Sequence, residues 1–452
     1  MYFIYSLLLT VGFLILLPRF ILDAFRHGKY VAGFRERWGS LSPIRRNGRP
    51  VIWIHCVSVG ETQAARPLVQ GLRKRYPHSL IAISTITLTG QNLAREIFKD
   101  DAAKVFYFPF DWRWVVRRTL KAINPQVVLV METELWPGFL RECEVQQIPV
   151  ALVNGRLSTQ SFRRYRPIRR FMARVLSCLS LAIMQTEADA QRLRALGMEP
   201  RKTFIFGNMK FDAGTMPDTD SLTTALRERF KLDALPVILA ASTHEPEETI
   251  ILNSFRQVAS RSETKPRLII APRHPERFAE VADLLKTAGL RWVRRTATPQ
   301  ASDVEAEVIL LDSIGELRSV YTLASIVFVG GSIARTGGHN VLEPAAVGAP
   351  VIVGSHTYNF HSIVETFREA GAIVQLQPMS DSATIVELGN EISELLANPA
   401  KRRELGALAQ RLVTENGGAT ERTLRALDSM ITSAANASPG PAALKANNTP
   451  IP

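Results

Sequence analysis

The sequence predicts an α/β protein with two Rossmann-like, doubly wound parallel-sheet domains facing a cleft, preceded by an N-terminal helix. Three observations support this class. The chain has 452 residues, more than one typical hydrophobic core holds. Short β-branched runs alternate with helical patterns, as they do in parallel α/β sheets. The alternation pauses at a polar stretch, residues 212–220, and then restarts, so two such sheets are expected.

The first domain is expected over residues 35–212. Its strands are predicted from apolar runs at residues 51–55, 80–84, 105–108, 126–131, 150–153, 181–185 and 204–206. The second domain is expected over residues 220–430, with strands at 237–241, 267–271, 291–293, 308–311, 326–329 and 351–353. Residues 432–452 are rich in Ala, Asn and Pro and lack apolar periodicity, which predicts a disordered tail.

Composition narrows the class of protein. The apolar fraction of 46% is that of a globular protein, and the net charge of +13 indicates acidic partners: nucleic acid, anionic lipid or phosphorylated substrates. Cys56, Cys143 and Cys178 are far apart in the sequence and form no C-x-x-C pair. This sparse, odd count is typical of a reducing compartment and argues against a disulfide framework or a zinc site.

Residues 1–22 are predicted to form a membrane-anchor helix. The segment carries one charged residue, Arg19, and its length is close to the roughly 20 residues that span a bilayer. Basic residues follow it with few acids between them, a bias that places the domains on the cytoplasmic side. A buried or membrane-surface helix, broken at Pro18, remains the alternative.

A glycine-rich segment, residues 328–354, predicts a phosphate-binding loop between two strands. The pairs Gly330-Gly331 and Gly337-Gly338 precede Asn340, which can cap a helix beginning near Val341. Glycines let a ligand phosphate approach the backbone, and free N–H groups at a helix start attract it. Glu343 lies one turn later, where a carboxylate can reach a ribose hydroxyl pair. The alternative is an ordinary turn with a capping box from Asn340 to Glu343.

Polar residues cluster where the predicted strands end. They are Glu61; Glu132 and Glu134; Asn208 and Lys210; Ser242 to Glu245; Arg273 and His274; and Gly315 and Glu316. Because ligands of parallel sheets bind outside the carboxyl ends of the strands, the cluster predicts a binding site.

Each of these residues also has a structural explanation. Glu61, Asn340 and Glu316 could be helix caps. Glu132 and Glu134 could form ion pairs with Arg156 or Arg163, and Lys210 could lie along the surface with its charge in water. The residues from Arg273 to Arg277 could form a solvated helical turn.

A basic run could bind an anionic surface or be a solvated helical face. It consists of Arg163, Arg164, Arg166, Arg169, Arg170 and Arg174, with almost no acids. Only Phe162, Tyr165 and Phe171 lie among these arginines, which is weak support for base stacking.

Six motifs follow one another along the chain. They are His55-Cys-Val-Ser-Val-Gly-Glu61, Met131-Glu-Thr-Glu-Leu-Trp-Pro137, Gly207-Asn-Met-Lys-Phe-Asp212, Ala241-Ser-Thr-His-Glu245, Pro272-Arg-His-Pro-Glu-Arg277 and Gly337-Gly-His-Asn-Val-Leu-Glu343. Together they resemble the 3-deoxy-D-manno-octulosonic acid (Kdo) transferases of lipopolysaccharide synthesis. The resemblance implies a GT-B glycosyltransferase fold. It also implies CMP-Kdo as donor and a lipid A precursor, lipid IVA, as acceptor at the cytoplasmic face of the bacterial inner membrane.

The resemblance also implies roles for individual residues. Glu61 would be the general base, and Glu132 and Lys210 would stabilise the transition state. The CMP moiety would be held by Arg273, His274, Ile314, Gly315, Glu316, Asn340, Val341, Leu342 and Glu343. The chain has no Asp-x-Asp pair or His/Asp cluster suited to a divalent ion, so neither a metal nor a cofactor is expected.

Two other functions are compatible with parts of the sequence. Another GT-B enzyme, such as a UDP-sugar transferase or epimerase, would share the paired domains and the glycine-rich loop. The motifs around Glu61 and Met131–Pro137 argue against it. A membrane-tethered protein that binds anionic lipid or nucleic acid is suggested by charge alone.

Overall fold

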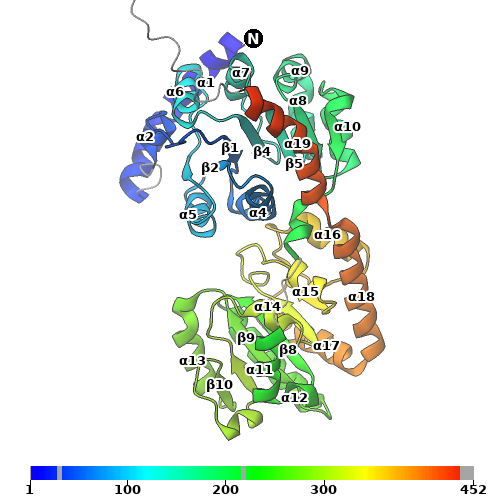
Figure 1. The fold of residues 1–452 in the computed structure, drawn as a ribbon. Helices are drawn as coiled ribbons and strands as arrows, with labels where there is room; N and C mark the ends of the chain where they lie inside the picture. The colour runs from blue at the N-terminus through cyan, green and yellow to red at the C-terminus, as the bar shows by residue number, and fades with distance from the viewer. Residues whose placement is uncertain (1, 28–32, 215–219, 438–452) are drawn as a thin grey trace, which may run out of the picture. The chain divides into compact units, whose positions relative to one another are not determined.

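The computed structural model describes residues 2–27, 33–214 and 220–437 (Figure 1). The chain forms two compact units: Met1–Asp212 together with the chain from Gly417 onward, and Ala213–Asn416. Each unit contains one seven-stranded parallel sheet, which confirms the predicted fold class. The cleft between the two domains stays a prediction.

The sheet of the first unit has the order β3-β2-β1-β4-β5-β6-β7. These strands are Lys104–Tyr107, Leu80–Thr85, Val51–His55, Val127–Met131, Val150–Gly155, Leu181–Met184 and Thr203–Ile205. The order reverses between β1 and β4, which pair in parallel. Such a reversal point is where doubly wound sheets bind ligands.

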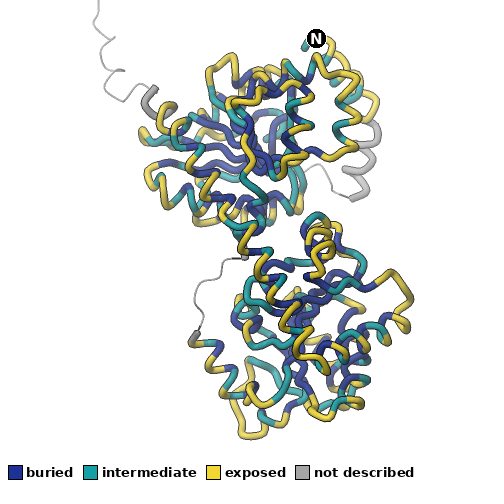
Figure 2. The backbone as a smooth tube through the Cα atoms, turned by 90° about the vertical axis from the view of Figure 1, so that its right-hand side faces the viewer, coloured by how far each residue is buried: buried dark blue, intermediate teal, exposed yellow. Residues whose placement is uncertain are grey.

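Helices pack on this sheet, and its central strands β1, β4 and β5 are buried along their whole length (Figure 2). The helices are α3 (Val59–Ala64), α4 (Arg66–Arg75), α5 (Leu88–Ile97), α6 (Arg113–Ile123), α7 (Pro137–Val145), α8 (Thr159–Tyr165), α9 (Arg169–Leu176), α10 (Glu187–Ala195) and α19 (Ala419–Ala437). Shorter pieces are α2 (Phe34–Arg37), η1 (Arg166–Ile168), η2 (Pro200–Lys202) and η3 (Met209–Gly214).

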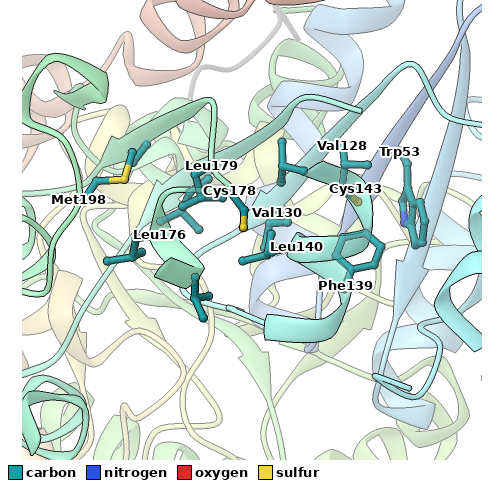
Figure 3. Close-up of a cluster of buried hydrophobic side chains, with 14 of the residues drawn as sticks. Trp53, Val128, Val130, Phe139, Leu140, Cys143, Leu176, Cys178, Leu179 and Met198 are labelled. Atoms are coloured by element: carbon teal, nitrogen blue, oxygen red, sulfur yellow. The ribbon is translucent and has the colours of Figure 1, made fainter. Parts of the chain in front are cut away.

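Alternate side chains of β1 enter two hydrophobic clusters, because successive residues of a strand face opposite sides. Trp53 packs with Val128 and Phe139 in one cluster (Figure 3). Ile54 belongs to the other cluster, which also includes Leu427 of α19. The final helix therefore completes the core of the first unit.

Two predicted boundaries are corrected by α19. The second domain was expected to run to residue 430, but its chain returns to the first unit at Gly417. The disordered tail was expected from residue 432, but α19 continues to Ala437, and residues 438–452 lie outside the described residues. The amphipathic helix is ordered because its apolar side chains pack on the first sheet.

The N-terminal segment forms helix α1 (Tyr2–His27), and one of its faces packs on the first unit. The Tyr5 hydroxyl donates to Oδ2 of Asp111 at 2.7 Å, and Trp112 Nε1 donates to Thr10 Oγ1 at 2.9 Å. Within the residues that the structure describes, no helix has both the length and the apolar character needed to traverse a bilayer. The prediction of a membrane-spanning helix is not supported. Part of α1 packs on the rest of the first unit through these bonds, while other side chains, such as Phe3 and Ile15, are exposed.

The sheet of the second unit has the order β10-β11-β9-β8-β12-β13-β14. These strands are Trp292–Arg294, Val308–Leu310, Arg267–Pro272, Val237–Thr243, Ile326–Val329, Val351–Val353 and Val374–Gln375. The order reverses between β8 and β12. Every strand predicted from the sequence is present, and β14 is an additional strand of two residues.

The second unit also contains the following helices. They are α11 (Asp220–Phe230), α12 (Glu247–Arg261), α13 (Phe278–Thr287), α14 (Leu317–Tyr321), α15 (Leu342–Ala346), α16 (His361–Glu369), α17 (Asp381–Ala397) and α18 (Pro399–Asn416). The 3-10 turns are η4 (Leu232–Ala234), η5 (Pro275–Arg277) and η6 (Ala301–Glu305).

Candidate active site

Glu61 lies in the first turn of α3, the helix that follows β1. The end of β1 is at the reversal point of the first sheet. Its Oε2 accepts a hydrogen bond from the Val57 amide at 2.7 Å, and its Oε1 accepts one from the Ser58 hydroxyl at 3.1 Å. The Ser58 hydroxyl in turn caps the helix by accepting from the Glu61 amide. Glu61 therefore does take part in the hydrogen bonds at the start of the helix, as the helix-cap explanation predicts. The same bonds hold its carboxylate in one orientation.

The environment of Glu61 favours its neutral form. The residue is only 7% exposed. Burial, and next the nearby charge of Glu132, raise the pKa of Glu61 to about 8. A perturbed carboxyl at a sheet reversal point is a functional-site candidate, since catalytic acids and bases commonly have shifted pKa values.

Glu132 follows β4, the strand next to β1, and adopts a left-handed backbone with φ of 53°. Its backbone amide donates to the Val153 carbonyl at 3.0 Å, which holds the turn against β5. The left-handed conformation is uncommon for a residue with a Cβ and occurs often at active sites. Glu134 lies two residues further on, and burial and then the Glu132 charge raise its pKa.

Lys210 brings a positive charge to these carboxylates. Its Nζ lies 3.6 Å from Oε1 of Glu132, and both side chains are mostly buried. A Cβ added at Gly60 would lie 3.9 Å from the same Nζ, so Lys210 also approaches the Glu61 loop. Within the described residues Glu132 pairs with Lys210 and not with Arg156 or Arg163.

Asn154 positions the Lys210 loop, and the sequence reasoning missed it. This residue is the penultimate residue of β5, has a φ of 54° and is fully buried. Its Oδ1 accepts from the Met209 amide at 3.0 Å, one residue before Lys210. An asparagine inside an otherwise apolar strand was the signal that could have identified it.

The predicted nucleotide-binding residues lie in the second unit, the first of them after β9. Arg273 and His274 are both exposed, and the Arg273 amide donates to the Thr243 carbonyl at 3.0 Å. The His274 ring meets the His244 ring edge-on, with centroids 5.1 Å apart. An exposed guanidinium beside an imidazole can bind a phosphate.

The loop after β11 contains the next group. Ile314 is 80% exposed, and Gly315 has φ of 86°. Glu316 precedes α14 without capping it; its carboxylate pairs with Arg295 at 3.1 Å and accepts from Ser313 Oγ at 2.6 Å. The alternative prediction, that Glu316 caps a helix, is therefore wrong.

The third group begins α15. Asn340 Oδ1 accepts from the Leu342 amide at 3.0 Å, and the helix begins at Leu342, in agreement with the predicted start near Val341. Val341 and Leu342 are buried in the core, so only their backbone can face a ligand. The Asn340–Glu343 capping box does not form, because Glu343 pairs with Arg318 at 2.9 Å.

The glycine-rich loop is held by one buried carboxylate, Glu247 of α12. It accepts hydrogen bonds from the backbone amides of His244, Gly331, Ser332, Ile333 and Ala334. A Cβ added at Gly330 would lie 2.5 Å from the Ser242 carbonyl, so this position requires glycine. Among the described residues no cluster of three or more His, Cys, Asp or Glu side chains could hold a metal ion.

Comparison with known proteins places this chain in a family. The family model described as 3-Deoxy-D-manno-octulosonic-acid transferase (kdotransferase) matches residues 32–213. The 3-deoxy-D-manno-octulosonic acid transferase of Haemophilus influenzae is 35% identical over 93% of this chain and 97% of its own length. That of Bordetella pertussis is 34% identical over 83% of this chain and 86% of its own. The chain is thus a glycosyltransferase. It belongs to the Kdo transferase family.

The fold is shared more widely. A UDP-N-acetylglucosamine 2-epimerase from Listeria monocytogenes, described as putative in its structure report, has a TM-score of 0.52 and 18% identity. The match covers 85% of this chain and 97% of that one. At this identity the similarity shows the fold alone.

Proposed function

We propose that the protein transfers Kdo from CMP-Kdo to a lipid A precursor, lipid IVA, in lipopolysaccharide core synthesis, by direct displacement. The observation that carries this proposal is the set formed by Glu61, Glu132 and Lys210 at the reversal point of the first sheet. A buried carboxylate lies there in the field of a second carboxylate, which is paired with a lysine.

Glu61 is proposed as the general base. A sugar hydroxyl is a poor nucleophile until it loses its proton, and a carboxylate within hydrogen-bond reach can accept that proton. The pKa of about 8 makes the ionised form a stronger base than an ordinary glutamate. The bonds from Val57 and Ser58 orient the carboxylate without removing its remaining lone pairs.

Glu132 and Lys210 are proposed to stabilise the charges of the transition state. Loss of CMP leaves cationic character on the anomeric carbon, which a carboxylate stabilises, as in glycoside hydrolysis. The departing phosphate gains negative charge, which an ammonium group stabilises. The paired arrangement holds both groups in place before the reaction.

The second unit is proposed to bind the CMP moiety. Arg273 offers an exposed cation for phosphate, and Ile314 an exposed apolar surface. Arg295 holds the carboxylate of Glu316, and Arg318 holds that of Glu343. In these positions the two carboxylates could accept hydrogen bonds from a cytidine nucleotide. CMP-Kdo is the donor substrate in this proposal, and no cofactor or metal takes part.

The acceptor and the inner membrane are proposed to meet the first unit at α1 and the basic run. One face of α1 exposes apolar side chains, among them Phe3, Leu8 and Ile15. The arginines of α8, η1 and α9 are exposed, and Tyr2 of α1 contacts Phe171 of α9 at 5.7 Å between ring centroids. Apolar and cationic surfaces side by side are suited to the cytoplasmic surface of an anionic bilayer.

One reaction tests the proposal. The full chain is incubated with CMP-Kdo and a tetra-acylated lipid A precursor, and the lipid product is analysed by mass spectrometry. The expected result is a lipid heavier by one or more Kdo residues, formed in the presence of a metal chelator. Lipid transfer from a UDP-sugar instead, or no transfer from CMP-Kdo, would overturn it.

A further inference from the structure

Two histidines meet at the reversal point of the second sheet, and neither is among the residues named above for catalysis or for holding the CMP moiety. His244 follows β8, and His339 lies in the loop after β12. Their Nε2 atoms are 2.8 Å apart, and the ring planes differ by 8°. Ring centroids 5.0 Å apart with nitrogens this close describe two coplanar rings joined edge to edge, not a face-to-face stack.

This contact restricts the protons that the pair can hold. A neutral imidazole has one donor and one acceptor nitrogen, so one Nε2 donates and the other accepts. Two imidazolium rings would place two N–H groups against each other, so the pair carries at most one positive charge. Burial lowers the pKa of His339 to about 3 and also lowers the pKa of His244, which keeps the free pair neutral near pH 7.

Among the described residues, the carboxylates next to the pair already bind other groups. Arg273, His274 and Arg277 face His244 and oppose its protonation. Glu248 favours it, but its Oε1 already binds Arg277 at 2.6 Å and Thr243 at 2.8 Å. Glu247, which caps the His244 amide, is committed to the glycine-rich loop.

His339 has a similar environment. His244, Arg273 and His274 disfavour its charged form, and the glycine-rich loop packs against its ring. A Cβ added at Gly331 would lie 2.9 Å from His339 Cδ2. A negatively charged ligand bound here would therefore stabilise the protonated form of the pair, which the neighbouring cations disfavour.

We propose that the His244–His339 pair binds the phosphate of the cytidine nucleotide and takes up one proton from solvent when the nucleotide binds. The proposal rests on the proposed function, because it assumes a cytidine nucleotide in the second unit. One ring becomes imidazolium and donates to a phosphate oxygen, while the shared Nε2 proton keeps the two rings aligned. The proton returns to solvent when the nucleotide leaves.

The test is calorimetric titration of the full chain with CMP at pH 8 in two buffers of different ionisation enthalpy. The number of protons taken up is the difference between the two observed enthalpies divided by the difference between the two buffer ionisation enthalpies. We expect a value near one for the wild type and near zero for His244→Gln, whose amide can keep a hydrogen bond to His339. His361→Gln, an exposed histidine of the same unit, is the matched control and should match the wild type.

Cytidine, which lacks the phosphate, separates a binding role from a structural one. His244→Gln should weaken CMP about tenfold, as expected for loss of a charge-assisted hydrogen bond, and leave cytidine affinity unchanged. Equal weakening of both ligands, or CMP binding by the wild type without proton uptake, would overturn the inference and leave the proposed function standing. A wild-type protein that binds neither ligand would overturn both.

Discussion

The Lys210 ammonium lies 3.6 Å from the Glu132 carboxylate, although the two residues follow different strands, β7 and β4. Both side chains are mostly buried, at 17% and 22% exposure, so their attraction is screened less than that of a surface pair. Asn154 holds the backbone beside Lys210, and the left-handed turn at Glu132 aims its carboxylate. This pair defines the electrostatics at the edge of the first sheet.

Replacing Glu61 by glutamine should remove catalysis and spare the fold. Glutamine has the same shape and can still accept from the Val57 amide, but it cannot take a proton. Turnover should fall by about 10²- to 10⁴-fold, the usual worth of a general base. CMP affinity should be nearly unchanged, since the nucleotide is assigned to the second unit. Transfer rate, calorimetry and melting temperature are measured on the same sample.

The matched control for this variant is Glu187→Gln. Glu187 also lies in the first turn of a helix, α10, but is exposed. If Glu61→Gln loses only stability, by about 1 kcal/mol, and retains turnover, the residue is a helix cap and nothing more.

The pH profile of transfer should report the Glu61 titration. The ionised form is the base, so kcat/KM should rise with pH and level off above the pKa of about 8. Residual activity of Glu61→Gln should lack this rise. A wild-type profile that is flat between about pH 6 and about pH 9 would show that Glu61 is not the general base.

Stability should show the opposite trend with pH. The pKa of Glu61 is raised in the folded protein above its ordinary value of 4.5. Between these values the folded state holds the proton more than the unfolded state does, so the contribution of Glu61 to stability is present at low pH and is lost as pH rises through about 8. Denaturant unfolding of the wild type and Glu61→Gln across this range measures the difference, which should shrink as pH falls toward 4.5.

Replacing Lys210 by methionine should lower kcat and leave CMP affinity intact. Methionine keeps much of the length and apolar stem but loses the charge that faces Glu132. A fall of about 10²- to 10³-fold is expected, the range for removing one transition-state donor. Lys210→Arg keeps the charge and should recover part of the rate. A Lys210→Met enzyme with unchanged kcat and weaker CMP binding would instead move the lysine to the nucleotide site.

Replacing Arg163, Arg164 and Arg166 together by serine should weaken acceptor use. These exposed arginines belong to the first unit, whereas the predicted nucleotide residues belong to the second, so CMP affinity should be unchanged. Binding to vesicles containing anionic lipid should fall, at about 1 kcal/mol for each cation near the surface. Vesicle co-sedimentation and KM for the acceptor are the measurements.

A charge-matched triple variant, Lys265, Arg403 and Arg411 to serine, controls for net charge, because these exposed residues lie in the second unit. Equal losses of vesicle binding and acceptor use in both triple variants would indicate that the basic run is only a solvated helical face.

Calorimetric titration with CMP and UMP distinguishes the nucleotide classes. The motifs of the second unit match a CMP-sugar family, so CMP should bind and UMP should not. Equal affinities would revive a UDP-sugar enzyme as the alternative.

Much of the fold could be predicted because the local composition of the chain identifies most strands. A run such as Val51–His55 is buried along its whole length, so its composition alone marks it as a central strand. Strand β14 was missed because two half-buried residues carry no periodicity. The return of α19 to the first unit was missed for a different reason: its amphipathic pattern shows that it packs on a core, not on which one.

The sequence by itself determined which residues stand at strand ends, and hence that Glu61, Glu132 and Lys210 were candidates. It could not determine their partners. Glu132 meets Lys210 rather than Arg156, Glu343 meets Arg318 rather than Asn340, and the Nε2 atoms of His244 and His339 lie within hydrogen-bond distance. The physical reason is that side-chain pairing depends on the lateral order of strands, which tertiary packing decides. Residues far apart in the chain meet when the sheet brings the loops that carry them to the same edge, as it does for Glu132 after β4 and Lys210 after β7, two strands that are separated by β5 and β6.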